Sequence, residues 1–241
     1  MAPLIALLLA IAGCGTRDTL PVATTTSVEA SGVLPRLVAG YEKASGTHLR
    51  VVVVGSGQAL ALLERGDVEA ALTHDPDGEQ ALVARGIAKR LPIMRNDFVL
   101  VGPPADPAGA KGKSVEAALR AIAEGGHRFL SRGDDSGTHR REKKLWQAIG
   151  VVPAPPAYRE VGQGMGETLT MASEMGAYTL VDTATLATFR SRIRLTTLVA
   201  GDPRLANPYA ALWRTRGGGR FAEWLRSAEA RAIVRPLFTP L

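Results

Sequence analysis

The sequence predicts an α/β protein of two lobes, each a mixed, mostly parallel sheet flanked by helices. Strand-like and helix-like segments alternate from residue 20 onward, which is typical of helices packed on a mainly parallel sheet. The proline-rich stretch 103–107 interrupts this alternation and divides it into two sets. We interpret the interruption as a crossing between lobes, with residues 20–102 and 195–241 in lobe 1 and residues 103–194 in lobe 2.

Residues 1–13 precede this fold and are predicted to be a signal peptide. They carry no charge, and their apolar run at 4–12 has the length of a signal-peptide core but not the roughly 20 residues that span a bilayer. Small residues stand directly before Cys14, as in a bacterial lipobox, so we expect Cys14 to be lipidated and residues 14–19 to form a tether. The alternative interpretation is a buried helix with an incidental cysteine.

The composition limits the partners that the protein can have. Cys14 is the only cysteine, which excludes an intrachain disulfide. The net charge of +6 fits an anionic ligand or surface. Aromatic residues make up only 5% and no basic run is interleaved with them, so no nucleic-acid partner is expected. The expected location is the periplasm or the outer face of the cell membrane, with Cys14 as the only membrane anchor.

In the first set of segments, apolar or β-branched runs predict strands and a 3.6-residue apolar spacing predicts helices. Val33, Leu37 and Tyr41 fall on one face of a helix, and the run 49–54 is β-branched, as in a parallel strand covered on both faces. The expected strands are 20–24, 49–54, 70–74 and 97–101, and the expected helices are 28–44, 59–65 and 79–85.

The second set repeats this alternation and then returns to the first lobe. Phe221, Trp224 and Leu225 share one face of a closing helix. The expected strands are 128–130, 158–161, 177–181, 195–199 and 209–213, and the expected helices are 115–124, 139–149, 167–175, 183–190 and 221–234.

Four loops rich in hydroxyls or glycine follow predicted strands and open predicted helices: 24–27, 55–58, 131–138 and 162–166. In open α/β sheets, ligands bind at such carboxyl ends of strands. Two of the loops belong to each lobe, so the sequence predicts a binding cleft between the lobes. Taken singly, each loop has a second interpretation, which is ordinary helix capping.

The loop 131–138, SRGDDSGT, carries most of the chemistry. A strand-to-helix turn presents free backbone N–H groups and the positive end of the helix dipole to an anion. Arg132 adds a planar fork of donors suited to an oxyanion, and Asp134 is placed to brace that guanidinium. Ser136 and Thr138 add hydroxyls, and Gly137 allows the backbone to approach a ligand closely.

Several motifs in this order resemble the tungstate-binding proteins of bacterial ABC importers, within the type II periplasmic binding protein class. The matches include TTTS at 24–27, VGSGQAL at 54–60, HDP at 74–76, NDFVLVGP at 96–103, SRGD at 131–134, SGT at 136–138, GMG at 164–166, YTL at 178–180 and NPY at 207–209. The resemblance implies a two-lobed type II fold and a monomeric solute-binding protein. Such a protein has no cofactor and delivers an oxyanion, tungstate in the first place, to an inner-membrane ABC permease.

The resemblance also implies which residues face the oxyanion through hydrogen bonds, without any direct metal ligand. These positions are Thr25, Thr26, Ser27, Ser56, Arg132, Ser136, Gly137 and Thr138. One departure concerns cleft closure. The family pattern after the strand of Tyr178 usually continues Asp-Arg, and this chain has Asp182-Thr183 instead. Whether the role of that arginine is lost or kept at Thr183 stays open.

The pattern R-x-D-x-S-G-T at 132–138 also resembles phosphate-binding proteins of the same fold class. Tungstate, molybdate and sulfate are fully deprotonated near neutral pH and need only donors, whereas phosphate keeps a proton and is helped by an acceptor carboxylate. The loops 24–27 and 55–58 contain no carboxylate, Asp134 is expected to engage Arg132, and Asp135 points either to solvent or to the ligand. The donor set favours tungstate, molybdate or sulfate, and it does not separate tungstate from molybdate.

An enzyme, for example a hydrolase, is the alternative of a different class. Asp134 stands where the nucleophile elbow G-x-S-x-G needs its first glycine. His74 and Asp75 could form a dyad, but a turn at Pro76 is favoured. His139 and Glu142 have i, i+3 spacing, which is expected to be a solvated helix face, and none of the four histidines has zinc-type spacing. We therefore do not expect an enzyme.

Overall fold

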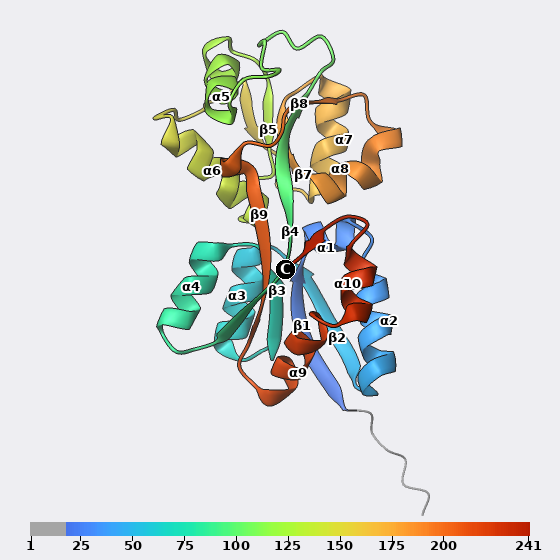
Figure 1. Ribbon diagram of the computed structural model, residues 1–241. Helices are drawn as coiled ribbons and strands as arrows, with labels where there is room; N and C mark the ends of the chain where they lie inside the picture. The colour runs from blue at the N-terminus through green and yellow to red at the C-terminus, as the bar shows by residue number, and fades with distance from the viewer. Residues whose placement is uncertain (1–17) are drawn as a thin grey trace, which may run out of the picture.

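The computed structural model describes residues 18–241, which form two lobes joined end to end by two long strands (Figure 1). These strands are β4 (Lys89–Gly102) and β9 (Ala206–Trp213). The predicted signal peptide, 1–13, and Cys14 lie outside the described residues. No helix in the described part is long and apolar enough to cross a membrane.

Lobe 1 is built on a sheet with strand order β10-β4-β9-β3-β1-β2. β1 pairs in parallel with β2 and β3, whereas β9 is antiparallel to both β3 and β4. The remaining strands are β1 (Thr19–Thr25), β2 (His48–Val54), β3 (Ala70–Thr73) and β10 (Thr239–Pro240). The helices are α1 (Thr26–Ala30), α2 (Leu34–Ser45), α3 (Ser56–Arg65), α4 (Pro76–Ala84), α9 (Arg216–Trp224) and α10 (Ala228–Val234).

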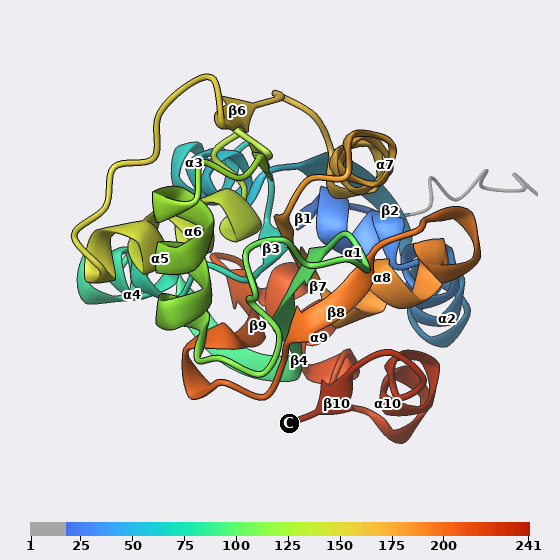
Figure 2. The ribbon, with the colours of Figure 1, turned by 90° about the horizontal axis from the view of Figure 1, so that it is seen from above.

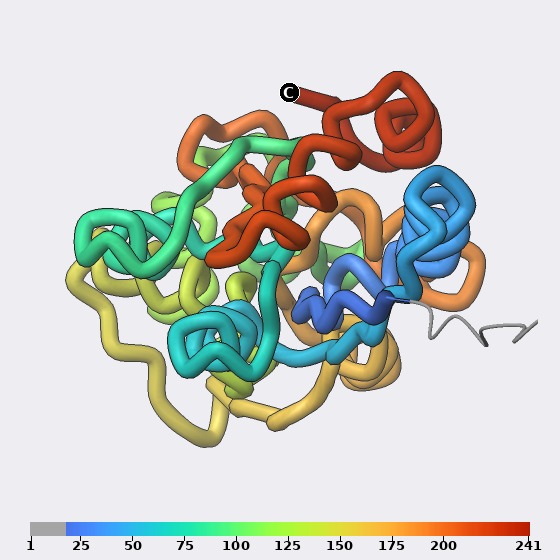
Figure 3. Tube along the Cα trace, turned by 90° about the horizontal axis from the view of Figure 1, so that it is seen from below, coloured from blue at the N-terminus to red at the C-terminus, as the bar shows by residue number. Residues whose placement is uncertain are grey.

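Helices cover both faces of this sheet (Figure 3). One apolar cluster joins Leu37 and Tyr41 of α2 to Phe221 of α9, and the other joins Leu63 of α3 to Leu82 of α4. Apolar burial on both faces supplies most of the driving force for this arrangement. The sheet therefore holds the carboxyl ends of β1, β2 and β3 rigidly at the edge that faces lobe 2.

Lobe 2 uses the second half of β4, which pairs antiparallel with β7 (Thr179–Asp182) and β8 (Thr196–Val199). β5 (Phe129–Ser131) pairs in parallel with β6 (Tyr158–Glu160), and Phe129 also bridges to Tyr178 in parallel. Figure 2 shows helices on both sides of these strands. They are α5 (Val115–Glu124), α6 (Gly137–Ala148), α7 (Met165–Met175) and α8 (Thr183–Phe189), followed by the 3-10 turns η1 (Arg190–Arg192) and η2 (Pro203–Leu205).

The mixed α/β fold with helices on both faces agrees with the prediction. The sheets contain more antiparallel pairs than the predicted, mostly parallel arrangement. β4 and β9 cross between the lobes and return, so each runs against its neighbours and adds antiparallel pairs. The helix expected at 28–44 is divided into α1 and α2, because Gly32 adopts a left-handed φ of 77° between them. The closing helix is similarly divided where Ser227 caps α10.

The crossing lies within β4 rather than after it. Residues 98–101 pair with β7, and the β8 residues Leu198 and Val199 pack in the same apolar cluster as Leu100. Leu205 belongs to that cluster too. In place of the expected boundaries at 102/103 and 194/195, we propose that lobe 2 comprises about residues 98–205.

Candidate functional site

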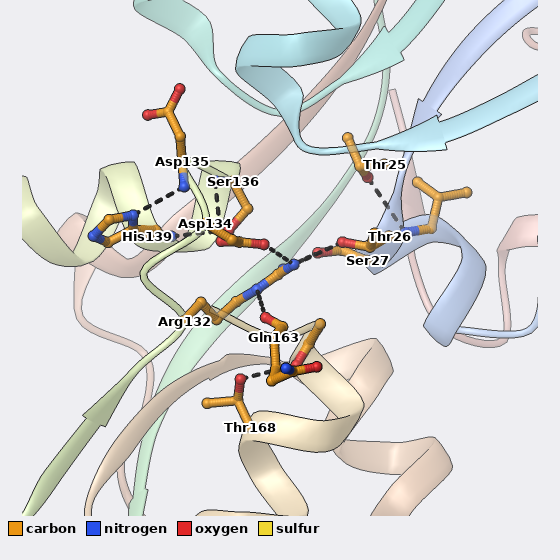
Figure 4. Close-up of polar contacts among 12 residues, drawn as sticks. Thr25, Thr26, Ser27, Arg132, Asp134, Asp135, Ser136, His139, Gln163 and Thr168 are labelled. Atoms are coloured by element: carbon orange, nitrogen blue, oxygen red, sulfur yellow. Dashed lines mark hydrogen bonds and ion pairs between the residues drawn. The ribbon is translucent and has the colours of Figure 1, made fainter. Parts of the chain in front are cut away.

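Arg132 lies at the centre of the contact between the lobes (Figure 4). It follows β5, and only 1% of its surface is exposed. Its guanidinium donates to Thr26 Oγ1 at 2.7 Å and to Ser27 Oγ at 3.5 Å, both in lobe 1. Its Nε donates to the carbonyl of Gln163 in lobe 2, at 3.4 Å. One buried cation thus joins the loops 24–27, 131–138 and 162–166, which come from both lobes.

Asp134 braces Arg132, as predicted. Its Oδ2 lies 2.5 Å from Arg132 Nη2, and its Oδ1 accepts a hydrogen bond from the Ser136 N–H at 3.2 Å. Both carboxylate oxygens are therefore engaged. Burial lowers the pKa of Arg132, and the neighbouring Asp134 carboxylate opposes that change. A guanidinium remains charged near neutral pH despite such burial.

Asp135 points away from Arg132 and is largely exposed, which favours the solvent side of the alternative that the sequence left open. Its carboxylate pairs with Arg140, at 2.6 Å between Oδ2 and Nη2, and its side chain is 69% exposed. Its backbone adopts a left-handed φ of 55° and its N–H donates to His139 Nδ1 at 3.1 Å. Among the described contacts of the loop 131–138, no carboxylate is left to accept a proton from a ligand.

The first turn of α6 presents the predicted serine, glycine and threonine. Ser136 is the N-cap, and its Oγ accepts from the His139 N–H at 3.2 Å, so the capping interpretation holds for this hydroxyl. Thr138 Oγ1 is buried and has no hydrogen-bond partner within the described part of the chain. A Cβ added to Gly137 would lie 2.6 Å from the His74 ring. Only glycine allows the lobes to approach this closely here.

The lobe 1 loops 24–27 and 55–58 face Arg132 and the first turn of α6 across the contact between the lobes. Thr25 caps α1, with its Oγ1 accepting from the Val28 N–H at 3.4 Å, so its hydroxyl has a structural role. Ser27 and Ser56 are fully buried, and Ser56 Oγ accepts from the His74 N–H at 3.5 Å. Gly55 packs beside Ser136, because a Cβ there would lie 3.4 Å from its Cα. The structure thus gathers the predicted residues, but it connects Arg132 directly to Thr26 and Ser27 only.

A buried chain of polar side chains behind the site was missed by sequence reasoning. Asn96 Nδ2 donates to Asp182 Oδ1 at 3.0 Å, Asn207 Nδ2 donates to Asn96 Oδ1 at 2.7 Å, and Asn207 Oδ1 lies 2.8 Å from His74 Nδ1. Asn207 Nδ2 also donates to the Tyr209 hydroxyl, so its oxygen is the acceptor for His74. Burial lowers the pKa of His74 to about 4, which keeps the imidazole neutral at pH 7. The chain runs through β4 and β9 at the point where they cross between lobes.

His139 and Glu142 were expected on a solvated face, and this expectation is wrong. Both are buried, because this face of α6 contacts Glu160 and Tyr158 of β6, and Trp146 packs on Phe129 of β5. Glu142 Oε1 accepts from Trp146 Nε1 at 3.1 Å and from the Tyr158 hydroxyl at 2.9 Å. Burial raises the pKa of Glu142 to about 7. Among the described residues, no group of three or more His, Cys, Asp or Glu could hold a metal ion.

Comparison with known proteins places this geometry in a family. A family model described as the PBP superfamily domain matches residues 13–229. The tungstate-binding protein TupA of Peptoclostridium acidaminophilum is 36% identical over 93% of this chain and 86% of its own length. The chain belongs to the TupA family within the PBP superfamily.

Solved structures agree with membership of the TupA family. The structure described as the tungstate ABC transporter from Geobacter sulfurreducens is 39% identical and has a TM-score of 0.79, covering 91% of this chain and 98% of that one. The tungstate-binding TupA from Desulfovibrio alaskensis is 38% identical with a TM-score of 0.77, covering 93% and 99%. The two-lobed fold described above is therefore that of TupA proteins.

Proposed function

We propose that this protein is an extracytoplasmic solute-binding protein that captures tungstate and delivers it to an ABC permease. The observation that carries the proposal is Arg132, a buried cation held between hydroxyls of lobe 1 and a lobe 2 carboxylate that is already fully engaged. Such a donor-only site suits a fully deprotonated tetrahedral dianion. The TupA relatives, which are named as tungstate-binding proteins, support tungstate as the first choice.

Within this proposal the site residues have different roles. Arg132 supplies the positive charge, while Thr26, Ser27, Ser56 and Thr138 supply hydroxyl donors. Gly137 lies in the first turn of α6, where free N–H groups and the helix dipole favour an anion. The hydroxyls of Thr25 and Ser136 hold the two helix starts in place. The donors bind the oxyanion and carry out no catalytic step.

Molybdate and sulfate are the second choice, because they present the same charge and geometry to the same donors. Phosphate is less favoured, since the carboxylate oxygens of Asp134 and Asp182 already accept hydrogen bonds within the protein. A protonated phosphate oxygen would therefore lack an acceptor at these groups. The proposal also holds that the protein acts as a monomer.

Calorimetry on a chain beginning at Thr16, with tungstate, molybdate, sulfate, phosphate and one amino acid, tests this assignment. Tungstate is expected to bind and to raise the melting temperature with increasing ligand concentration, as mass action requires. Sulfate is expected to bind more tightly than phosphate. Binding of phosphate alone, or of the amino acid alone, would overturn the proposal.

We also propose that Cys14 is lipidated and anchors the protein outside the cytoplasmic membrane. The apolar run at 4–12 and the small residues before Cys14 motivate this proposal. Replacement Cys14→Ser in the full chain should release the protein from the membrane fraction or leave an unprocessed precursor. Lipid labelling that persists in the Cys14→Ser chain would contradict the anchor.

A further inference from the structure

A basic groove lies at the end of lobe 1 that is remote from the oxyanion site. It has a volume of about 940 Å³ and is lined by 86–89, at the start of β4, and by residues from 213 to 223, at the end of β9 and on α9. Lys89 pairs with Trp213 in the sheet, seven residues before the crossing at Asn96. Seven strand residues span roughly 23 Å, so the groove is a separate surface.

The groove carries an excess of positive charge. Its lining includes four exposed cations, which are Lys89, Arg214, Arg216 and Arg220, and one carboxylate, Glu223. None of the four cations forms an ion pair with a described residue, and Arg214 donates instead to the backbone carbonyls of Leu63 and Glu64. The nearby Glu69 is engaged by Thr215. Clustered cations that are not paired with carboxylates of the described residues create a positive potential that attracts an anionic surface.

The groove also contains an aromatic side chain. Trp213 is half-buried, with its ring beside Gly219 of α9. Tryptophan next to arginines is a combination suited to the boundary between water and lipid headgroups, where an amphipathic ring and fixed charges are both favourable.

The N-terminal end of the described chain lies at this same end of lobe 1 (Figure 1). β1 begins at Thr19, and Leu20 lies beside α9, since a Cβ added to Gly217 would be 3.3 Å from Leu20 Cδ1. Asp18 follows Cys14 by four positions in the chain, which is at most roughly 14 Å of extended chain. An anchor at Cys14 would therefore bring this end of lobe 1 close to the membrane surface.

We propose that the basic groove is a membrane-facing surface that binds the headgroups of anionic phospholipids. It gives the protein a second membrane contact beside the lipid anchor. This inference rests on the proposed anchor at Cys14, because that anchor turns this end of lobe 1 toward the membrane. A patch of Lys and Arg on one face adds electrostatic attraction to anionic lipids to the attachment that a lipid anchor supplies. Each Lys or Arg near an anionic leaflet adds to that attraction, and salt weakens it.

Vesicle co-sedimentation of a chain beginning at Thr16 tests the proposal without the anchor. That chain keeps all described residues, including all four apolar clusters. It is expected to sediment with vesicles of equimolar phosphatidylglycerol and phosphatidylcholine, but not with pure phosphatidylcholine, and to be released by NaCl. The double variant Arg216→Gln/Arg220→Gln is expected to bind the anionic vesicles about ten- to thirty-fold more weakly.

A matched control removes the same charge elsewhere. Arg36→Gln/Arg159→Gln changes two exposed arginines outside the groove and should bind vesicles as the unchanged chain does. Equal binding by both double variants would overturn the proposal, and so would equal binding to neutral vesicles. Release by inorganic phosphate beyond that by NaCl of equal ionic strength would also overturn it, in favour of a small-anion site. Calorimetry with tungstate on the same variants should show unchanged affinity, so a failure of the oxyanion function would be seen separately.

Discussion

At the residue scale, the pair Arg132 and Asp134 decides how the site binds an anion. The carboxylate fixes the guanidinium before a ligand arrives, and the lobe 1 hydroxyls of Thr26 and Ser27 reach the same cation. Hydrogen bonds to charged groups contribute about 1.5–3 kcal/mol each. We therefore expect the affinity for the anion to depend more on Arg132 than on any other residue of the site.

We expect Arg132→Ala to weaken tungstate binding by roughly ten- to several-hundred-fold, and Arg132→Lys, which keeps the charge but loses the fork, to recover only part of it. Asp134→Asn should soften the Arg132→Ala defect, because the carboxylate otherwise faces the anion without its partner. Calorimetry on the single and double variants measures this coupling. Additive effects would contradict the bracing role, and an unchanged affinity in Arg132→Ala would place the cation outside the binding site.

The local sequence was sufficient to predict that Arg132 and Asp134 pair and that the loops 24–27 and 131–138 begin helices. SRGDDSGT and TTTS each combine a strand end, a helix cap and donors within a few consecutive residues, so spacing alone indicates the turn. His74 was not predicted as part of the site, since its partner Asn207 is 133 residues away. Its role depends on β4 and β9 running side by side, which local spacing does not specify.

At the element scale, α6 connects the site to the interior of lobe 2. Its first turn meets lobe 1 at Gly137, while one turn further on Glu142 is buried between Trp146 and Tyr158. The sequence predicted a helix here, but the solvated face that it predicted for His139 and Glu142 is buried. The i, i+3 spacing of His139 and Glu142 is compatible with a solvated face as well as with a buried one. Packing on β5 and β6, whose pairing is not encoded in the helix, decides between them.

The buried carboxyl of Glu142 predicts a pH-dependent stability. Burial raises the pKa of this carboxyl from 4.5 to about 7. Its contribution to the free energy of unfolding is therefore fully present below about pH 4.5 and is lost as the pH rises through 7. The lowered pKa of His74 has the opposite effect on stability. Its contribution to the free energy of unfolding is present above pH 6.5, the ordinary pKa of histidine, and is lost as the pH falls to about 4. The unchanged chain therefore shows the sum of two opposed effects.

The variant Glu142→Gln should isolate the contribution of this carboxyl to the pH dependence of stability. Relative to the unchanged chain, we expect it to gain about 2–3 kcal/mol of unfolding free energy between pH 4.5 and pH 8, because the amide does not ionise and its oxygen still accepts hydrogen bonds. Chemical denaturation at a series of pH values measures the difference. Glu124→Gln, on the exposed end of α5, serves as control and should show no such difference. Parallel pH curves for the unchanged and Glu142→Gln chains would contradict the prediction.

At the scale of the whole molecule, α6 also carries cations that reach across to lobe 1. Arg140 pairs with Asp75, and Lys144, one turn later, pairs with Asp77. Asp75 is only 4% exposed, and Arg140 is the one cation paired with it among the described residues. Lys144 and Asp77 are both exposed to solvent. Exposed ion pairs contribute little, so the Arg140 pair is the one expected to matter. It lies beside the anion site, on the helix whose first turn presents Gly137 and Thr138.

This arrangement predicts that affinity for the oxyanion depends on a residue that need not touch it. Contacts on both lobes favour the closed population, so a pair that forms between the lobes adds to the apparent affinity. Arg140→Ala leaves the buried Asp75 carboxylate unpaired in the closed form and should weaken tungstate binding about five- to thirty-fold. Lys143→Ala, on the same helix but without an ion pair to a described residue, should not.

Two measurements separate closure from direct contact with the ligand. Small-angle scattering should show a smaller radius of gyration when tungstate is bound to the unchanged chain, and a smaller decrease for Arg140→Ala at equal ligand concentration. Calorimetry on Arg140→Ala/Asp75→Asn should recover part of the affinity, because the neutral amide no longer needs a cation when the lobes close. An equal loss in Arg140→Ala and Lys143→Ala would mean that net charge, rather than the pair between the lobes, sets the affinity.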